Sequence, residues 1–107
     1  MKYNLDLKGD YIAIAATFEN ESSAKAMVND LKVKGFKADY FYLPNKSNSS
    51  EELHKVFIGP YENEEETNQW IQNLDLEVTL IDLTNGSVLR TIKSNSQIQI
   101  EKEKLAK

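Results

Sequence analysis

The sequence contains no cysteine and only one histidine. These two absences exclude a disulfide framework and leave no cluster of the thiolates and imidazoles that bind zinc. A Ser-His-acid triad would depend on His54 alone, and an exposed strand residue is the simpler interpretation of that histidine. We therefore expect a chain that is not an enzyme and that needs no metal and no cofactor.

Long apolar runs are also missing. A membrane-spanning helix needs about 18 or more consecutive apolar residues, so we expect no membrane insertion by this chain. Residues 1–6 lack the apolar stretch of a signal peptide. Two locations are compatible with this pattern: the cytoplasm, or the periplasm and cell envelope if the chain is a piece of an exported protein.

Basic runs are absent, and the formal net charge is −4 over 107 residues. Nucleic-acid binding depends mostly on Lys and Arg neutralising phosphates, so we expect no nucleic-acid partner. The acidic runs at residues 51–52 and 64–66 are explained by a solvated loop and by a helix N-terminus, where carboxylates are favourable. A chain of this length with 40% hydrophobic residues suits a single domain with a modest core.

What the sequence does contain is an internal repeat. Residues 14–21 (Ile-Ala-Ala-Thr-Phe-Glu-Asn-Glu) recur 43 positions later as residues 57–64 (Phe-Ile-Gly-Pro-Tyr-Glu-Asn-Glu). Asn20 and Asn63 stand where a helix N-cap belongs, because an Asn side chain accepts hydrogen bonds from first-turn amides. Apolar residues follow at matching helical offsets, namely Met27, Val28 and Leu31 in the first copy and Trp70, Ile71 and Leu74 in the second. The repeat predicts two helices with these residues, Trp70 included, in the core.

Each predicted helix follows a predicted strand. Residues rich in β-branched and aromatic side chains indicate four strands, at 11–18, 37–43, 53–58 and 77–83. The order β-α-β-β-α-β is typical of the α+β ferredoxin-like (split βαβ) fold, an antiparallel four-stranded sheet with both helices on one face.

A C-terminal β-hairpin extension is expected beyond this unit. Asn85-Gly86 is a strong signal for a two-residue type I′ turn, after which residues 88–93 should form a further strand. Residues 97–100 alternate like another short strand, and a polar tail follows. We expect a lead-in at residues 1–10, the main domain at residues 11–83, and the extension and tail at residues 84–107.

Residues 55–61 read Lys-Val-Phe-Ile-Gly-Pro-Tyr, close to a heptad that the sporulation-related repeat (SPOR) domain usually writes Arg-Val-x-Val-Gly-Pro-Phe. The capped helix that follows, the Gly35-Phe36 helix exit and the aromatic end of the first strand are also similar to this family. The resemblance covers residues 11–82. It implies a non-catalytic module that binds bacterial peptidoglycan, favours glycan strands without stem peptides, and brings proteins to the division septum.

The resemblance also implies where glycan would lie, namely on the sheet face away from the helices, against the first and third strands and nearby aromatic rings. The candidate glycan-binding residues are therefore Ile14, Thr17, Tyr40, Tyr42, Lys55 and Phe57. Three positions depart from the family pattern, and in the first strand Ile14 replaces a usual Gln and Ala16 a usual Gly. Lys55 replaces the usual Arg, which keeps the charge but loses the planar guanidinium.

Strand alternation predicts which side chains share a face. The residues expected to face the helices are Ala13, Ala15, Val56 and Ile58, and those expected to face away are Ile12, Ile14, Ala16, Lys55 and Phe57. We expect a face this apolar to be covered rather than open to water. Three interpretations remain open: the C-terminal extension covers it; it is a surface for protein–protein interaction or self-association; or Phe57, with Tyr40 or Tyr42, stacks on sugar rings.

Overall fold

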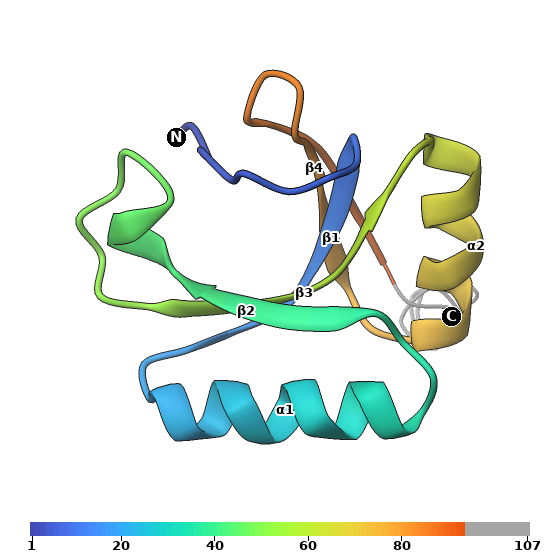
Figure 1. The fold of residues 1–107 in the computed structure, drawn as a ribbon, viewed down its shortest axis with the longest axis horizontal. Coiled ribbons are helices and arrows are strands. Elements are labelled where there is room, and N and C mark those ends of the chain that lie inside the picture. The colour runs from blue at the N-terminus through green and yellow to red at the C-terminus, as the bar shows by residue number, and fades with distance from the viewer. Residues whose placement is uncertain (94–107) are drawn as a thin grey trace, which may run out of the picture.

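The protein forms one five-stranded antiparallel sheet with two helices on the same face, as shown by a computed structural model that describes residues 1–93 (Figure 1). The elements in chain order are β1 (Tyr11–Phe18), α1 (Glu21–Val33), β2 (Ala38–Tyr42), the 3-10 turn η1 (Leu43–Asn45), β3 (His54–Tyr61), α2 (Glu64–Leu74), β4 (Val78–Asp82) and β5 (Ser87–Ile92). The strands lie in the order β2-β3-β1-β4-β5. The predicted β-α-β-β-α-β order is confirmed. The strand expected at 97–100 and the polar tail lie outside the described residues.

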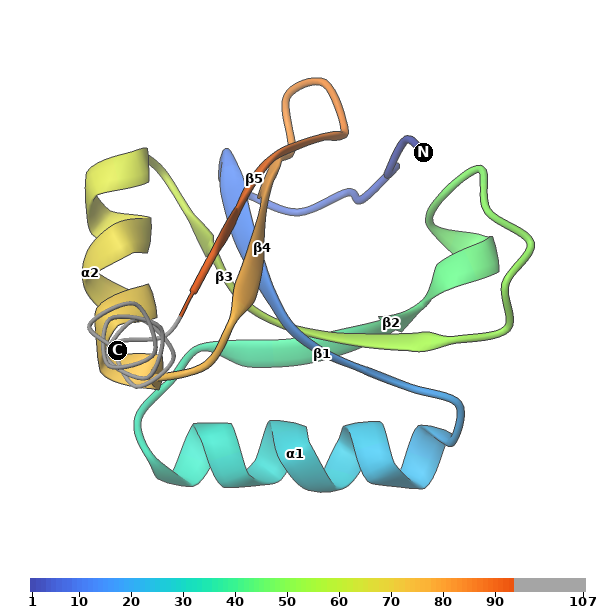
Figure 2. The same ribbon diagram turned by 180° about the vertical axis from the view of Figure 1, so that it is seen from behind.

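The sheet has five strands instead of the expected four with a hairpin extension, because the strand predicted at 88–93 pairs back on β4 and extends the same sheet as β5. It pairs antiparallel with β4, from Val78 opposite Ile92 to Asp82 opposite Ser87. Figure 2 shows β5 beside β4 at the edge of the sheet.

The turn before β5 is also longer than predicted. Gly86 has a φ of 72°, but Asn85 does not have the positive φ that a type I′ turn requires. The Gly86 amide donates to the Asp82 carbonyl at 2.8 Å. The Asp82 side chain accepts a bond from the Thr84 amide at 2.9 Å, and the Asn85 side chain accepts one from the Ser87 amide at 3.0 Å. These side-chain hydrogen bonds to nearby backbone amides stabilise the four-residue loop relative to the predicted two-residue turn.

The predicted N-caps of both helices are confirmed. The Asn20 side chain accepts a hydrogen bond from the Ser22 amide at 2.8 Å, and the Asn63 side chain accepts one from the Glu66 amide at 2.8 Å. Gly35 follows α1 with a φ of 93°, a left-handed conformation that suits glycine after a last helical turn. Neither helix of the described chain is long and apolar enough to cross a membrane.

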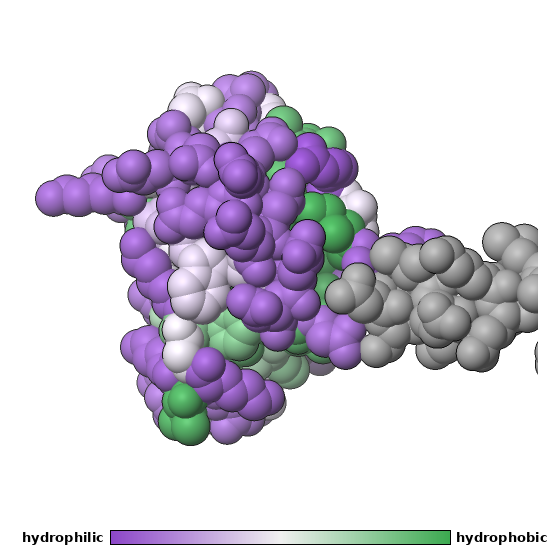
Figure 3. Space-filling model, turned by 90° about the vertical axis from the view of Figure 1, so that its right-hand side faces the viewer, coloured by the Kyte–Doolittle hydropathy of each residue, from purple (hydrophilic) through white to green (hydrophobic). Residues whose placement is uncertain are grey.

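Both helices pack against one face of the sheet and form what we call the helix-side core. Its members are Ala13, Ala24, Val28, Leu31, Phe36, Ala38, Val56, Ile58, Tyr61, Ile71, Val78 and Leu80. Trp70 and Leu74, expected to be fully buried, are only partly buried. The Trp70 ring lies at the rim, stacked on Tyr61 with ring centroids 6.0 Å apart. Beyond this rim the surface on the α2 side is mostly hydrophilic, with small separate apolar patches (Figure 3).

The opposite face carries a second cluster, which we call the outer core: Tyr3, Ile12, Ile14, Phe41, Leu43, Phe57 and Ile81. The prediction that Ile12, Ile14 and Phe57 point away from the helices is confirmed. Of the three interpretations left open for this face, cover by the C-terminal extension does not hold for the described part of that extension, since β5 continues the sheet at its edge. Residues 2–7, the N-terminal strap, cover this face instead (Figure 1).

Hydrogen bonds hold the strap from both sides. The Tyr3 amide donates to the Gly86 carbonyl at 2.8 Å, and the Asn4 amide donates to the Lys46 carbonyl at 2.7 Å. The Tyr3 side chain is 7% exposed and meets the Phe41 ring edge-on, with centroids 6.0 Å apart. The strap is therefore an integral part of the fold.

Candidate ligand pocket on the outer sheet face

A β-bulge in β1 decides which side chains reach the outer face near the end of this strand. Ile14 lies opposite Phe57 and Ala16 lies opposite Val56, so Ala15 is an extra residue in β1. Ala16 consequently packs toward the helix-side core, where we had expected it to face away. The bulge instead brings Thr17 to the outer face, because an extra residue shifts the alternation of side chains that follow it.

Thr17 and Lys55 form a polar pair across β1 and β3. The two residues are direct partners in the strand register. The Lys55 ammonium donates a hydrogen bond to the Thr17 hydroxyl oxygen, with Nζ and Oγ1 2.8 Å apart. One of the three Lys55 donors is used in this way.

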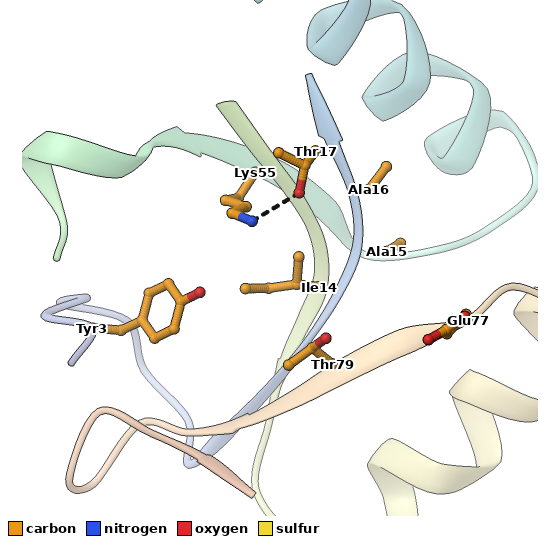
Figure 4. Close-up of a pocket in the computed structure, with 8 residues that line it drawn as sticks. All are labelled: Tyr3, Ile14, Ala15, Ala16, Thr17, Lys55, Glu77 and Thr79. Carbon is orange, nitrogen blue, oxygen red and sulfur yellow. Dashed lines mark hydrogen bonds between the residues drawn. The ribbon is translucent and has the colours of Figure 1, made fainter. Parts of the chain in front are cut away.

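A pocket of about 290 Å³ lies beside this pair. It is lined by Tyr3, Ile14, Ala15, Ala16, Thr17, Lys55, Glu77 and Thr79 (Figure 4). The pairing of β1 with β4 stops at Ile14 opposite Thr79, although β1 continues to Phe18. The pocket therefore lies where the two strands diverge, with Tyr3 of the strap on one side and Glu77 at the far end.

Burial shifts the pKa values of two residues that line the pocket. It lowers the pKa of the Lys55 ammonium from its ordinary value of 10.5, and the nearby Glu51 carboxylate partly opposes this effect. Burial also raises the pKa of the Tyr3 hydroxyl. The pocket thus combines a lysine donor and threonine hydroxyls with the apolar side chain of Ile14 and an aromatic ring. Such a combination can bind a ligand that has polar groups around an apolar ring face.

The structure brings together three of the six predicted site residues: Ile14, Thr17 and Lys55 all line this pocket. Phe57 is only 3% exposed and lies in the outer core, covered by the strap, so it presents no open ring for stacking in this conformation.

Tyr40 and Tyr42 lie on the other face of the sheet. Phe41 is the β2 aromatic that enters the outer core, and alternation sends its two neighbours toward the helix side. There the His54 ring lies near both tyrosines, with centroids 6.2 Å from Tyr40 and 5.1 Å from Tyr42. His54 is therefore partly buried, where we had expected an exposed strand residue. Among residues 1–93 no group of three or more His, Cys, Asp or Glu side chains is arranged to hold a metal ion.

Sequence reasoning missed Tyr3 as a pocket residue. A signal was present, since Tyr3, Leu5 and Leu7 alternate with polar residues in the pattern of an extended segment with one apolar face. Thr79 was also missed, because its part in the pocket depends on where β4 separates from β1.

The fold and the pocket together define a small α+β domain whose candidate recognition site lies on the sheet, away from the helices. The family model of the SPOR domain matches residues 7–82, which is more than half of the chain. The chain belongs to the SPOR domain family. This family is known for binding peptidoglycan, and its domains are non-catalytic binding modules found in envelope-associated proteins. No curated protein and no solved structure matches the chain.

Proposed function

We propose that this domain binds peptidoglycan glycan strands without cleaving them, through the pocket around Lys55 and Thr17. The observation that carries the proposal is the position of this polar pair. It lies on the sheet face away from the helices, on the two strands through which the resemblance implies that glycan is held. The family match supports peptidoglycan as the ligand class.

Each pocket residue has a role in this proposal. The Lys55 ammonium donates charge-assisted hydrogen bonds to carbonyl, hydroxyl or carboxylate oxygens of the glycan. Thr17 and Thr79 supply hydroxyls that donate or accept. Ile14 and Tyr3, each less than 10% exposed, form the inner wall of the pocket, against which a sugar would rest. The domain would act at the cell envelope, where it would bring an attached protein to the septum.

The test is co-sedimentation of the purified domain with cell-wall sacculi, before and after amidase treatment that removes stem peptides. We expect binding that increases after amidase treatment, with no release of soluble fragments. Lys55→Ala should weaken binding about tenfold, since hydrogen bonds to charged groups are worth ~1.5–3 kcal/mol. The matched control is Lys32→Ala on α1, which removes the same charge from the helix side of the domain.

Each negative result has a definite meaning. A wild-type domain that stays in the supernatant overturns the function. A Lys55→Ala domain that sediments like wild type overturns the site. Soluble fragments released by the pure domain contradict a non-catalytic role.

One observation favours self-association as a second function. The edge strand β5 exposes two large apolar side chains, Val88 at 46% and Leu89 at 40%. An exposed edge strand with apolar residues can pair with another chain. Light scattering should then report dimers that Leu89→Lys abolishes and that the control Val33→Lys, at an exposed position of α1, preserves. A monomer at all concentrations would remove this alternative.

A further inference from the structure

We propose that the N-terminal strap is a fixed wall of the ligand site, and that Tyr3 limits this site to a short stretch of glycan. This inference rests on the proposed function and specifies the length of ligand that the pocket takes. It differs from the arrangement in which a glycan strand lies across an open sheet, because here the strap closes part of that face.

The first argument is the anchoring of the strap. Tyr3 forms an antiparallel bridge with Ser47 of the β2–β3 connection, and its amide bonds to Gly86 of the β4–β5 loop. The Asn48 amide also donates to the Lys2 carbonyl at 3.1 Å, and the Lys2 amide donates to the Asn48 side chain at 2.9 Å. The strap is thus held by two connections that come from opposite edges of the fold.

The second argument is the close fit at Gly86. A Cβ atom added at this glycine would lie 2.0 Å from the Tyr3 carbonyl oxygen, a distance that no real contact allows. The β4–β5 loop therefore approaches the strap backbone as closely as only glycine permits. Tyr3 of the strap and Phe41 of β2, on which it packs, are both less than 10% exposed, and Leu5 and Leu7 of the strap are half-buried against the same outer core.

The third argument is the space that remains. With the strap in place, Phe57 and Ile12 are covered, and a pocket of about 290 Å³ that Tyr3 borders lies on the same face (Figure 4). Small-molecule sites usually measure ~300–1,000 Å³, so this pocket is at the small end of the range. It has room for a short part of a sugar chain.

The strap can be locked reversibly, because the chain has no cysteine of its own. Asn4 lies opposite Lys46 in the register set by the Tyr3–Ser47 bridge, and both side chains are exposed. The Asn4 amide donates to the Lys46 carbonyl, and residues opposite each other in antiparallel strands have Cα atoms ~4.5–5.5 Å apart, within the ~4.4–6.8 Å that a disulfide spans. The double variant Asn4→Cys/Lys46→Cys should therefore form one bond across the strap, with Asn4→Cys alone as the matched control.

The experiment measures binding of a single peptidoglycan disaccharide unit and of long amidase-treated strands to the locked and the reduced protein. If the strap is a fixed wall, the locked and the reduced protein should bind each ligand with the same affinity, within about twofold. If the oxidised form binds long strands ten times more weakly than the reduced form, the strap has to leave for binding and the inference is overturned.

A second variant tests Tyr3 itself. Tyr3→Ala should weaken binding of the disaccharide unit about tenfold, the effect of 1.4 kcal/mol, because the aromatic wall is lost. Tyr3→Phe should keep most of the affinity. Leu5→Ala is the control, since Leu5 belongs to the strap and packs on the outer core without lining the pocket.

The outcomes separate the inference from the function on which it rests. A Tyr3→Ala protein that binds like wild type overturns the inference and leaves the proposed function intact. Failure of the wild type, locked and reduced proteins to bind any peptidoglycan overturns the proposed function and the inference with it.

Discussion

The two faces of this sheet are closed in different ways. On one face, α1 and α2 contribute regular apolar stripes to the helix-side core. On the other, the outer core is covered by a strap without regular secondary structure, which is held by backbone bonds to two loops. The helices satisfy their own backbone hydrogen bonds, whereas the strap depends on distant partners for the same purpose. The strap covers only part of its face, and the candidate pocket lies beside it.

The largest effect is expected from Phe57→Ala, which tests whether the outer face is a true core. Phe57 is 3% exposed, and Phe41 lies beside it with ring centroids 5.8 Å apart. Truncating a buried phenylalanine usually lowers the free energy of unfolding by ~3–5 kcal/mol. Urea denaturation measures the loss. Val88→Ala at an exposed site should change stability by no more than ~0.5 kcal/mol, and a loss for Phe57→Ala below ~1 kcal/mol would show that the strap does not pack.

Leu31→Ala tests the helix-side core in the same way. This residue of α1 is 4% exposed, and its removal should lower the free energy of unfolding by ~2–5 kcal/mol. Val33→Ala on the same helix is the control, because Val33 is 88% exposed. Equal midpoints for the two variants in urea would contradict the packing of α1 on the sheet.

A pair of glycine variants then probes the strap alone. Gly86 and Gly35 both have positive φ values, 72° and 93°, so an alanine at either position costs at least ~1 kcal/mol. Only Gly86 lies against the strap, since nothing lies within 4 Å of a Cβ added at Gly35. We expect Gly86→Ala to lose more stability and to accelerate hydrogen exchange at the Asn4 amide. Unchanged exchange at Asn4 would mean that the loop does not hold the strap.

The smallest effect is expected from Tyr61→Phe. The Tyr61 hydroxyl is buried and has no hydrogen-bond partner among the described residues, so its removal should be neutral or slightly stabilising near neutral pH. Burial, with a smaller effect of Glu66, raises the pKa of Tyr61 to about 12.

The pH dependence of this variant follows from linkage. Above the ordinary value of 10.0 the unfolded chain loses the Tyr61 proton while the folded protein keeps it, so stability falls as pH rises from about 10 to about 12. The Tyr61→Phe variant should lack this part of the decrease in stability, because it has no hydroxyl to titrate. Identical urea midpoints for both proteins across this range would show that the Tyr61 hydroxyl is accessible to water.

The sequence was informative where a regular pattern and local capping act together. The strand at 11–18 was predicted with its correct ends, because a turn and the Asn20 cap follow it directly. Both helices, their caps and the apolar positions Val28, Leu31 and Ile71 were also predicted correctly. These features depend on residues within a few positions of one another.

The outer face was harder to predict because distant contacts decide it. Alternation identified Ile12, Ile14 and Phe57 correctly, but it failed at Ala16, since nothing in the local sequence marks the bulge at Ala15. None of the three interpretations left open for this face included the N-terminal segment as its cover. An alternating segment such as β5 can extend a sheet or lie across it, and only pairing with β4 decides between the two. Of the candidate site, Lys55, Thr17 and Ile14 were found, while Tyr3 depends on the path of the strap.

The Ile14–Phe57 partnership has a consequence for the internal symmetry of the fold. These two residues occupy the same position in the two copies of the 43-residue repeat, and they also face each other across β1 and β3. A pseudo-twofold axis therefore passes between them, and the register shifts of the two strands lie on either side of it. At this point each copy packs against its own counterpart, so the two side chains share one volume. Exchanging them, as Ile14→Phe with Phe57→Ile, conserves that volume, whereas Ile14→Phe alone overfills it.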